Sequence, residues 1–467
     1  MRLCIQGVFQ NIIVDDYIPY NKPRGVPAFS KAKGPELWVM LLEKAWAKVN
    51  GSYEDTITGI VSEGFRVLTG APCDYYNHDY VEELWDTILK ADQNNYIICA
   101  SAGRAQISKQ EYEEVGLVSD HAYAVIEAHE VDTADGRARL LRLRNPWGHK
   151  EWCGAWSDNS DKWTPELRRM LNVKEADDGE FFIAHEDYMN YFRSTVICKI
   201  HDGFVHESIA AGHALGKHSL IKIELRTATR VFFTVSQMST RLIPRGHKYE
   251  ISFVKMMLAF VDPEDEQFPL RYVDGRCWKD EDVTLDTECA LEPGEYIMFV
   301  EVDWADEGSY STFNFNTYSD EKVSLELLDA EHLSNFLPDI LMSCARQKTQ
   351  RKNYADKGKE GKQMFRCLSI TDSKAEYGFI YYENNSQEAS LCEHVLFNKL
   401  ENFVFLPPHE GQRVIVEVGP GESKIVIMKR TDRSASYSCT YYSSMVYSES
   451  KLLQRLPSQG KKVQIKY

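Results

Sequence analysis

The sequence contains no long apolar run and no surplus of positive charge. No stretch approaches the roughly 18 uninterrupted apolar residues of a membrane-spanning helix, and its beginning lacks the basic, apolar and small-residue order of a secretion signal. Its 54 Lys and Arg residues are outnumbered by 70 Asp and Glu residues, which gives a net charge of −16 and disfavours nonspecific binding of nucleic acid. The sequence therefore predicts no transmembrane segment and no nucleic-acid partner.

The sequence also lacks paired cysteines. Its eleven cysteines are scattered and include no Cys-x-x-Cys pair. This spacing favours neither a structural zinc site nor a framework of disulfide bonds. Unpaired thiols are typical of a reducing compartment, so together with the missing secretion signal they predict a cytoplasmic location.

The remaining composition is that of a folded protein. Hydrophobic residues make up 43% and aromatic residues 12% of the 467 positions, which is enough for packed cores. A chain of this length suits about three domains. The surplus of carboxylates favours hard cations as ligands, although most such charges are simply solvated.

Between residues 116 and 180, a histidine and an asparagine fall on two neighbouring predicted strands. His121 opens the alternating stretch HAYAVIEAHEV, and Asn145 ends LLRLRN. A cysteine nucleophile uses such a pair as its base, because the asparagine carbonyl orients the imidazole and an imidazolium–thiolate pair can form without a second buried carboxylate. From these residues alone, two unrelated polar side chains in a sheet remain the alternative.

Four motifs in order decide between these interpretations. The stretches HAYAV, RNPWG, EWCGAWSD and DDGEF resemble the second half of the calpain protease core. The resemblance implies that His121 is the catalytic base, that Asn145 orients it, and that Trp147 lies near the cleft and shields the pair from water. Taken by itself, Trp147 is equally typical of a half-buried aromatic residue that anchors a turn.

The N-terminal stretch resembles the calpain core just after its catalytic-cysteine helix. It predicts a strand over 3–14 and a helix over 36–50, the latter with the words ELW, LLEKA and NG. In the family the nucleophile lies in a Gln…Gly-x-Cys-Trp segment at a helix N-terminus, so the resemblance implies that Met1 follows that segment. None of the eleven cysteines is expected to open a helix behind glycine, where the helix dipole would lower the thiol pKa. We therefore expect no nucleophile in the sequence as it stands.

Two acidic loops follow the asparagine. Calcium takes six to eight oxygen ligands, commonly from carboxylates of neighbouring loops and a backbone carbonyl, but acidic loops are more often solvated surface. The resemblance implies one calcium ion between the two loops. Its ligands would be the side chains of Glu151, Asp158, Asp178 and Glu180 and the backbone oxygen of Ala176. Glu36 would belong to the family's other core calcium site, whose remaining ligands are missing.

Beyond residue 200, short stretches such as SLIKIEL and GEYIMFVEVDW alternate apolar and polar residues between turn signals. Regular short strands favour antiparallel β-sandwiches, and the first of them resembles the sandwich that follows the calpain core. We expect an α+β fold, a partial papain-like calpain core followed by two antiparallel β-sandwich domains. The expected parts are a remnant of the first core half (1–70), the second core half (71–200), a calpain-type β-sandwich (201–345), a basic linker (346–363) and a second β-sandwich (364–467).

Three functions remain open. The first is a calpain-like, calcium-dependent cysteine endopeptidase whose sequence here lacks the nucleophile, so that the chain alone is inactive. The second is a non-catalytic homologue that begins at Met1 and acts as a calcium-responsive scaffold. The third is a β-sandwich adaptor with the core remnant as a spacer. The apolar face around Leu37 and Trp38 favours the endopeptidase. This face would be exposed unless the missing part of the protease core, or another partner, covered it. Protein substrates or protein partners are expected, and peripheral membrane contact through the β-sandwich domains stays open.

Overall fold

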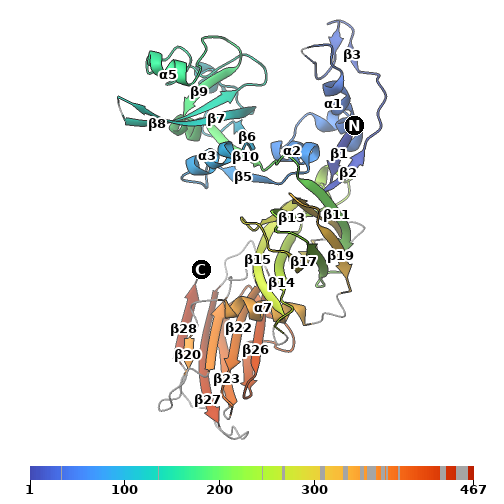
Figure 1. The fold of residues 1–467 in the computed structure, drawn as a ribbon, viewed down its shortest axis with the longest axis vertical. Helices are drawn as coiled ribbons and strands as arrows, with labels where there is room; N and C mark the ends of the chain where they lie inside the picture. The colour runs from blue at the N-terminus through green and yellow to red at the C-terminus, as the bar shows by residue number, and fades with distance from the viewer. Residues whose placement is uncertain are drawn as a thin grey trace. The chain divides into compact units, whose positions relative to one another are not determined.

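The computed structural model consists of two compact units, Met1–His206 and Glu207–Tyr467, which are described separately (Figure 1). The described residues are 1–467 without 33, 135, 245, 266–268, 306–310, 330–334, 348–351, 355–363, 370–373, 375–376, 388–389, 432–437, 449–460 and 467. Helices and antiparallel sheets are combined, as the sequence predicts. Within the described residues, no helix has the length and apolar character that crossing a membrane requires.

The first unit begins with two small hairpins and two helices. Their bounds are β1 (Arg2–Ile5), β2 (Val8–Asn11), β3 (Tyr20–Asn21), β4 (Val26–Pro27), α1 (Trp38–Asn50), the 3-10 turn η1 (Glu54–Thr56) and α2 (Val61–Thr69). The strand expected over 3–14 is divided by a turn at Gln6 and Gly7, both with positive φ. The helix expected over 36–50 begins two residues later, and Leu37 and Trp38 at its start are 53% and 59% exposed. An apolar surface therefore remains open at the start of α1.

A six-stranded antiparallel sheet forms the rest of this unit. In spatial order its strands are β5 (Cys73–Asn77), β10 (Phe192–Cys198), β6 (Ile97–Ala102), β7 (Ala122–Thr133), β8 (Gly136–Arg144) and β9 (Glu180–Ala184). Four helices accompany it, namely α3 (Trp85–Gln93), α4 (Lys109–Glu114), α5 (Pro165–Met170) and α6 (His185–Tyr191). Because successive side chains of a strand point to opposite faces, the β7–β9 region contributes to two cores.

One core lies under α3 and α6, and the other under α5. The larger contains Trp85, Tyr123 and Tyr188, and the smaller contains Trp156 and Trp163. Helix α5 begins at Pro165, because the Thr164 hydroxyl accepts a hydrogen bond from the Leu167 N–H and proline occupies the first helical position. Helix α3 begins at Trp85, later than its apolar periodicity suggests.

The described residues of the second unit form four sheets. In spatial order, the strands of the first sheet are β11 (Val205–Gly212), β18 (Thr312–Ser319), β13 (Val231–Ser236) and β16 (Asp282–Asp286). The strands of the second sheet are β15 (Leu270–Lys279), β14 (Phe253–Val261), β17 (Gly294–Asp303), β12 (Ser219–Leu225) and β19 (Ser324–Leu328). Strands of both sheets contribute to one apolar core, which includes Phe233, Met256 and Phe315. A 3-10 turn, η2 (Thr240–Leu242), follows β13.

The other two sheets share a second core. One sheet consists of β20 (Lys352–Tyr354), β21 (Met364–Ser369), β22 (Tyr377–Asn384), β26 (Ser423–Arg430) and β24 (Phe403–Phe405). The other consists of β25 (Arg413–Val418), β23 (Ser390–Glu401), β27 (Ser438–Ser448) and β28 (Lys461–Lys466). Tyr382, Phe397 and Val416 belong to this core. Strand β20 lies inside the linker expected at 346–363, of which 348–351 and 355–363 are outside the described residues. The division into two β-sandwich domains with the expected boundaries stays a prediction.

Helix α7 (Phe336–Arg346) packs between the two pairs of sheets. Its residues Phe336, Ile340 and Leu341 share one apolar cluster with Phe299 of β17 and Phe379 of β22. This cluster is continuous from the first pair of sheets to the second. The second unit is therefore held together by apolar packing across α7.

A buried charge network lies beside that apolar cluster. The Lys255 ammonium is fully buried and donates to Glu301 Oε1 at 2.7 Å, and Lys429 of β26 donates to the same oxygen at 2.6 Å. Asp303 accepts from Lys429 at 2.8 Å, and the Tyr377 hydroxyl donates to the other Glu301 oxygen. Burial raises the pKa of Glu301, but the two lysines outweigh it and hold that pKa well below its usual range. Two cations thus balance two carboxylates where β17 meets β22 and β26.

This balance predicts how the second unit responds to substitution. Lys255→Met should lower its stability by about 3–5 kcal/mol, because Glu301 would remain buried with only one cation. The double variant Lys255→Met, Glu301→Leu should recover most of that loss, since both charges are gone. Urea unfolding of the two variants measures the difference, and an equal loss in both would show that the charges do not compensate each other.

Candidate active site and cation loops

The structure brings His121 and Asn145 together at one end of the six-stranded sheet. His121 directly precedes β7 and Asn145 directly follows β8, and the pairing of Ala124 with Arg144 places these strand ends side by side. His121 Nε2 and Asn145 Oδ1 are 2.9 Å apart. The Asn145 side chain is fully buried. A buried amide thus lies in hydrogen-bond contact with an accessible imidazole.

The hydrogen bonds of the amide define which imidazole nitrogen is basic. Asn145 Nδ2 donates to the carbonyl oxygens of His149 at 2.8 Å and Lys150 at 3.0 Å, so its Oδ1 must be the atom that faces the histidine. The same oxygen accepts from the Trp147 N–H at 3.0 Å. Because Oδ1 can only accept, His121 Nε2 carries the proton and Nδ1 keeps its lone pair. Nδ1 is therefore the nitrogen that can take a proton from a reactant.

Two aromatic rings hold the imidazole in place. The Trp147 ring centre lies 4.5 Å from that of His121, while its indole remains 53% exposed. The Tyr123 ring meets the imidazole edge-on at 5.0 Å, and its hydroxyl accepts from the Val118 N–H at 2.8 Å. Burial raises the pKa of Tyr123 to about 12. Sequence reasoning assigned no role to Tyr123, although it is part of the HAYAV motif.

Gly179 connects this pair to the acidic loops. Its carbonyl accepts from the Asn145 N–H at 2.8 Å, and its N–H donates to Glu151 Oε1 at 2.7 Å. Its φ is 87°, and a Cβ at this position would come within 2.8 Å of the Asn145 carbonyl oxygen. Only glycine satisfies both the backbone angle and the close approach. The contact of Gly179 with Asn145 joins segments that are distant in the sequence, and sequence patterns did not predict it.

Among the described cysteines, none hydrogen-bonds with His121. Cys99 lies in β6, where burial raises its pKa to about 11, and Cys153 is exposed with Sγ 3.4 Å from the Glu151 carbonyl. One further stretch reads Gly275-Arg276-Cys277-Trp278, a Gly-x-Cys-Trp sequence that our motif reading overlooked. It lies within strand β15, so no helix N-terminus is present to lower the pKa of the Cys277 thiol.

Three of the expected calcium ligands line one small pocket. Asp158, Asp178 and Glu180 share it with Arg142 and Lys174. Asp158 is 8% exposed, and burial followed by the negative charge of Glu151 raises its pKa to about 6. Burial also raises the pKa of Glu151. The carboxylates of the two loops are thus close enough to repel one another.

Protein groups already engage part of this set. Glu180 pairs with Arg142 at 2.6 Å, a partner that sequence reasoning missed, and Asp178 accepts from the Glu180 N–H at 3.0 Å. The Ala176 backbone hydrogen-bonds to Asp158 and lowers its pKa slightly against the larger effects. Glu36 is exposed before α1 and is not among the residues of the pocket. Within the part of the chain that the structure describes, no three acidic, histidine or cysteine side chains form a ready metal-binding set.

The role of Asn145 can be tested on the imidazole itself. Asn145→Ala should shift His121 away from the Nε2–H tautomer and lower stability by about 1–3 kcal/mol, because the carbonyls of His149 and Lys150 lose a buried donor. Asn145→Asp should keep the Nε2–H tautomer and raise the histidine pKa. Imidazole ¹⁵N shifts measure both, with exposed Asn159→Ala as the control. An unchanged tautomer in Asn145→Ala would exclude the orienting role.

Comparison with known proteins agrees with this geometry. The profile of the calpain family cysteine protease matches residues 1–199. The calpain-1 catalytic subunit of Bos taurus is 39% identical over 199 residues, which cover 42% of this chain and 28% of that protein. The calpain-type cysteine protease DEK1 of Zea mays is 34% identical over 212 residues, which cover 43% of this chain and 10% of that protein.

Bacteroides uniformis β-glucuronidase 2 aligns over 56% of this chain and 26% of its own with 6% identity and a TM-score of 0.12. The chain spans about a tenth of the plant relative and less than a third of calpain-1. The similarity lies in the part that holds His121 and Asn145, and there the predicted resemblance is confirmed. Residues 1–199 of this chain belong to the calpain family of cysteine proteases.

Proposed function

We propose that this chain carries the base half of a calpain-like cysteine endopeptidase that cleaves proteins. The observation that supports it is the His121 Nε2–Asn145 Oδ1 hydrogen bond, because it leaves Nδ1 as a basic nitrogen at the accessible side of a fixed ring. The pair lies within the residues that match the family. An oriented imidazole of this kind serves a thiol nucleophile.

The chemistry of the pair follows from the free lone pair on Nδ1. Nδ1 takes the thiol proton as the thiolate attacks the peptide carbonyl, and the imidazolium then gives that proton to the leaving amine as the peptide bond breaks and a thioester remains. Nδ1 next takes a proton from water, whose oxygen attacks the thioester. The carbon–sulfur bond then breaks, the acid is released, and the imidazolium returns the proton to the departing thiolate. Asn145 keeps the ring oriented throughout. Trp147 limits the access of water to the imidazole from one side.

The nucleophile is proposed to come from a calpain Gln…Gly-x-Cys-Trp segment at a helix N-terminus. The described thiols have other surroundings: Cys99 has a raised pKa, and Cys277 lies within a strand. In this proposal the chain by itself has a base but no thiolate to activate. A scaffold without catalysis is the alternative function, and the same experiment separates the two.

A chimaera supplies the test. A calpain segment with the Gly-x-Cys-Trp helix joined to residue 1 should cleave casein in the presence of calcium, whereas the 467-residue chain alone should leave it intact. His121→Ala in the chimaera should lower the rate by about 10²–10⁴-fold, because general acid–base catalysis is lost. Fluorescent casein hydrolysis measures the rates.

Cys277→Ala is the matched control, because it removes a thiol from the other Gly-x-Cys-Trp stretch. It should leave the activity of the chimaera unchanged. Cleavage by the chain alone that disappears in Cys277→Ala would overturn the proposed source of the nucleophile. A folded chimaera without activity would favour the scaffold.

We also propose that the two acidic loops bind calcium. The residues that would hold it are Glu151, Asp158, Asp178 and Glu180, with the backbone oxygen of Ala176. The donor set fits, because it consists of oxygen atoms and because Asp158 is buried beside the negative charge of Glu151, which together raise its pKa and favour added positive charge. A bound calcium ion would supply that charge. Glu180 would have to leave Arg142 to join the set.

Calcium binding should depend on pH and on Asp158. Since the Asp158 pKa is raised to about 6, protons compete with the cation below that pH, so the apparent affinity should fall between pH values of about 7 and 5. Asp158→Asn should weaken binding at least about tenfold. Isothermal titration calorimetry measures both, with exposed Glu113→Gln as the control. Equal affinities for Asp158→Asn and the control would exclude this site.

A further inference from the structure

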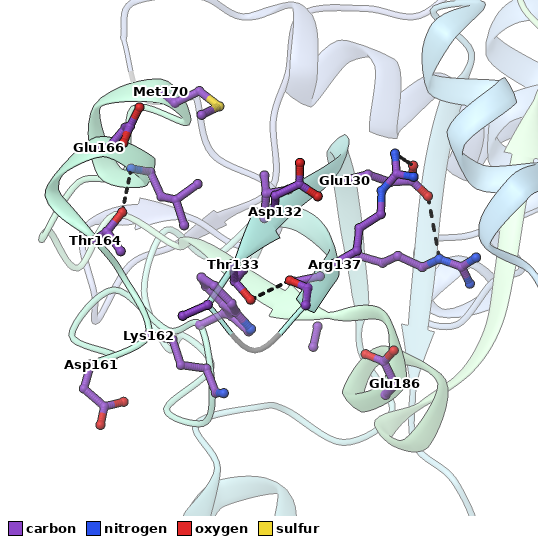
Figure 2. A pocket seen from close by; sticks show the side chains of 18 residues that line it. Glu130, Asp132, Thr133, Arg137, Asp161, Lys162, Thr164, Glu166, Met170 and Glu186 are labelled. Carbon is purple, nitrogen blue, oxygen red and sulfur yellow. Dashed lines mark hydrogen bonds and ion pairs between the residues drawn. The ribbon is translucent and has the colours of Figure 1, made fainter.

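A second, larger groove lies on the side of the sheet that α5 covers. It runs along the hairpin of β7 and β8 and is bounded by the loop that precedes α5, by α5 itself and by the start of α6 (Figure 2). None of the groups discussed as base, orienting residue or cation ligand lines it. No pattern in the sequence indicates it, because its walls come from three separate stretches of the chain.

The floor of this groove is apolar. Trp156 and Leu167 line it and are each 6% exposed, and both belong to the smaller core of the first unit. Ala138 packs against the same core from β8. Met170 at the end of α5 is 63% exposed and extends the apolar surface along the groove wall. Such a floor accepts aliphatic side chains.

One wall of the groove is a strand edge without a partner. Strand β9 ends at Ala184, which pairs with Leu140, so in the described residues Gly136–Arg139 of β8 pair only with β7. The Asn145 N–H donates to the Gly179 carbonyl and therefore points away from β7. Along a strand, the N–H and C=O groups of successive residues point alternately to one neighbouring strand and to the other. Arg137 is an even number of residues from Asn145 and so has the same orientation. The N–H and C=O of Arg137 therefore point away from β7. An extended chain can add to a sheet at such an edge.

The rim carries more negative than positive charge. The carboxylates of Asp132, Asp161 and Glu166 engage in no hydrogen bond or ion pair with other described residues. The side chain of Arg137 pairs with Glu130, and that of Arg139 pairs with Glu83 and Glu130, which leaves Lys162 as the remaining cation among the described residues of the rim. Figure 2 shows Asp132, Asp161 and Glu166 on different sides of the groove. A ligand that brings positive charge would be favoured here.

We propose that this groove binds an extended, basic peptide segment of a partner protein. The segment adds to the edge of β8 at Arg137, every second side chain is apolar and lies on Trp156 and Leu167, and basic side chains between them face the acidic rim. The periodicity follows from strand geometry, since alternate side chains of the added strand point to opposite faces. The affinity of such a contact comes from main-chain hydrogen bonds, and its selectivity from the charges.

This site is separate from the catalytic pair. His121 precedes the first residue of β7, and the groove lies along the last residues of the same twelve-residue strand. At about 3.3 Å per residue, roughly 35 Å separate them. A peptide in the groove therefore leaves the imidazole accessible, and the proposal does not depend on the chain being a protease.

The test uses the full chain and two fluorescently labelled peptides, one alternating lysine and valine and one alternating glutamate and valine. Fluorescence polarisation should show binding of the lysine peptide, weaker at higher salt, and no binding of the glutamate peptide. The combined variant Asp132→Asn, Asp161→Asn, Glu166→Gln should weaken binding at least about tenfold. Arg137→Pro should abolish it, because it removes the N–H at the free edge but no bond to β7.

The control variant Asp16→Asn, Glu54→Gln, Glu113→Gln removes the same charge from exposed positions elsewhere in the first unit and should leave binding unchanged. Circular dichroism and thermal unfolding establish that each variant is folded. Equal binding of both peptides, or an equal effect of the rim variant and the control, would overturn the proposal. Undiminished binding by folded Arg137→Pro would overturn the extended, edge-added geometry.

Discussion

The arrangement of the site in the first unit depends on the backbone of Gly179, which hydrogen-bonds to two other segments. Its carbonyl holds the N–H of Asn145, and its N–H holds the carboxylate of Glu151, so the loop of the orienting amide and the loops of the proposed cation site share a single residue. The positive φ and the close approach to the Asn145 carbonyl leave no room for a side chain. The backbone of Gly179 therefore links both acidic loops to the end of β8, and with it to the amide that contacts His121.

Much of this arrangement could be predicted from the sequence, because local patterns determine it. The alternation around His121 and Asn145 identified two strands, and the motif order identified the family. The start of α3 could not be predicted in the same way. Glu83 accepts from the Trp85 N–H and Asp79 pairs with Arg104, so residues before Trp85 are held in a non-helical conformation despite their helical periodicity.

Contacts between distant segments explain the other differences. Arg142 and Glu180 are 38 positions apart, and only the register of β8 with β9 makes them partners. The wall of the groove at Arg137 likewise results from β9 pairing with β8 only as far as Leu140, four pairs short of the end of the β7–β8 hairpin. Neither follows from periodicity, because a strand pattern predicts which face a side chain takes but not where its neighbour ends. Sequence patterns thus predicted the strands of the site, but they did not predict the Arg142–Glu180 ion pair or the strand edge at Arg137.

The two buried acidic sites differ in how their negative charge is compensated. We interpret the compensated site as structural and the other as the proposed cation site. Glu301 and Asp303 lie with Lys255 and Lys429, and the pKa of Glu301 falls although burial opposes it. That network is complete and needs no further ligand. At Asp158, burial followed by the negative charge of Glu151 raises the pKa to about 6, although Arg168 acts in the opposite direction. A protein with a net charge of −16 has many solvated carboxylates, but a buried carboxylate beside another one costs free energy that only a proton or an added cation relieves.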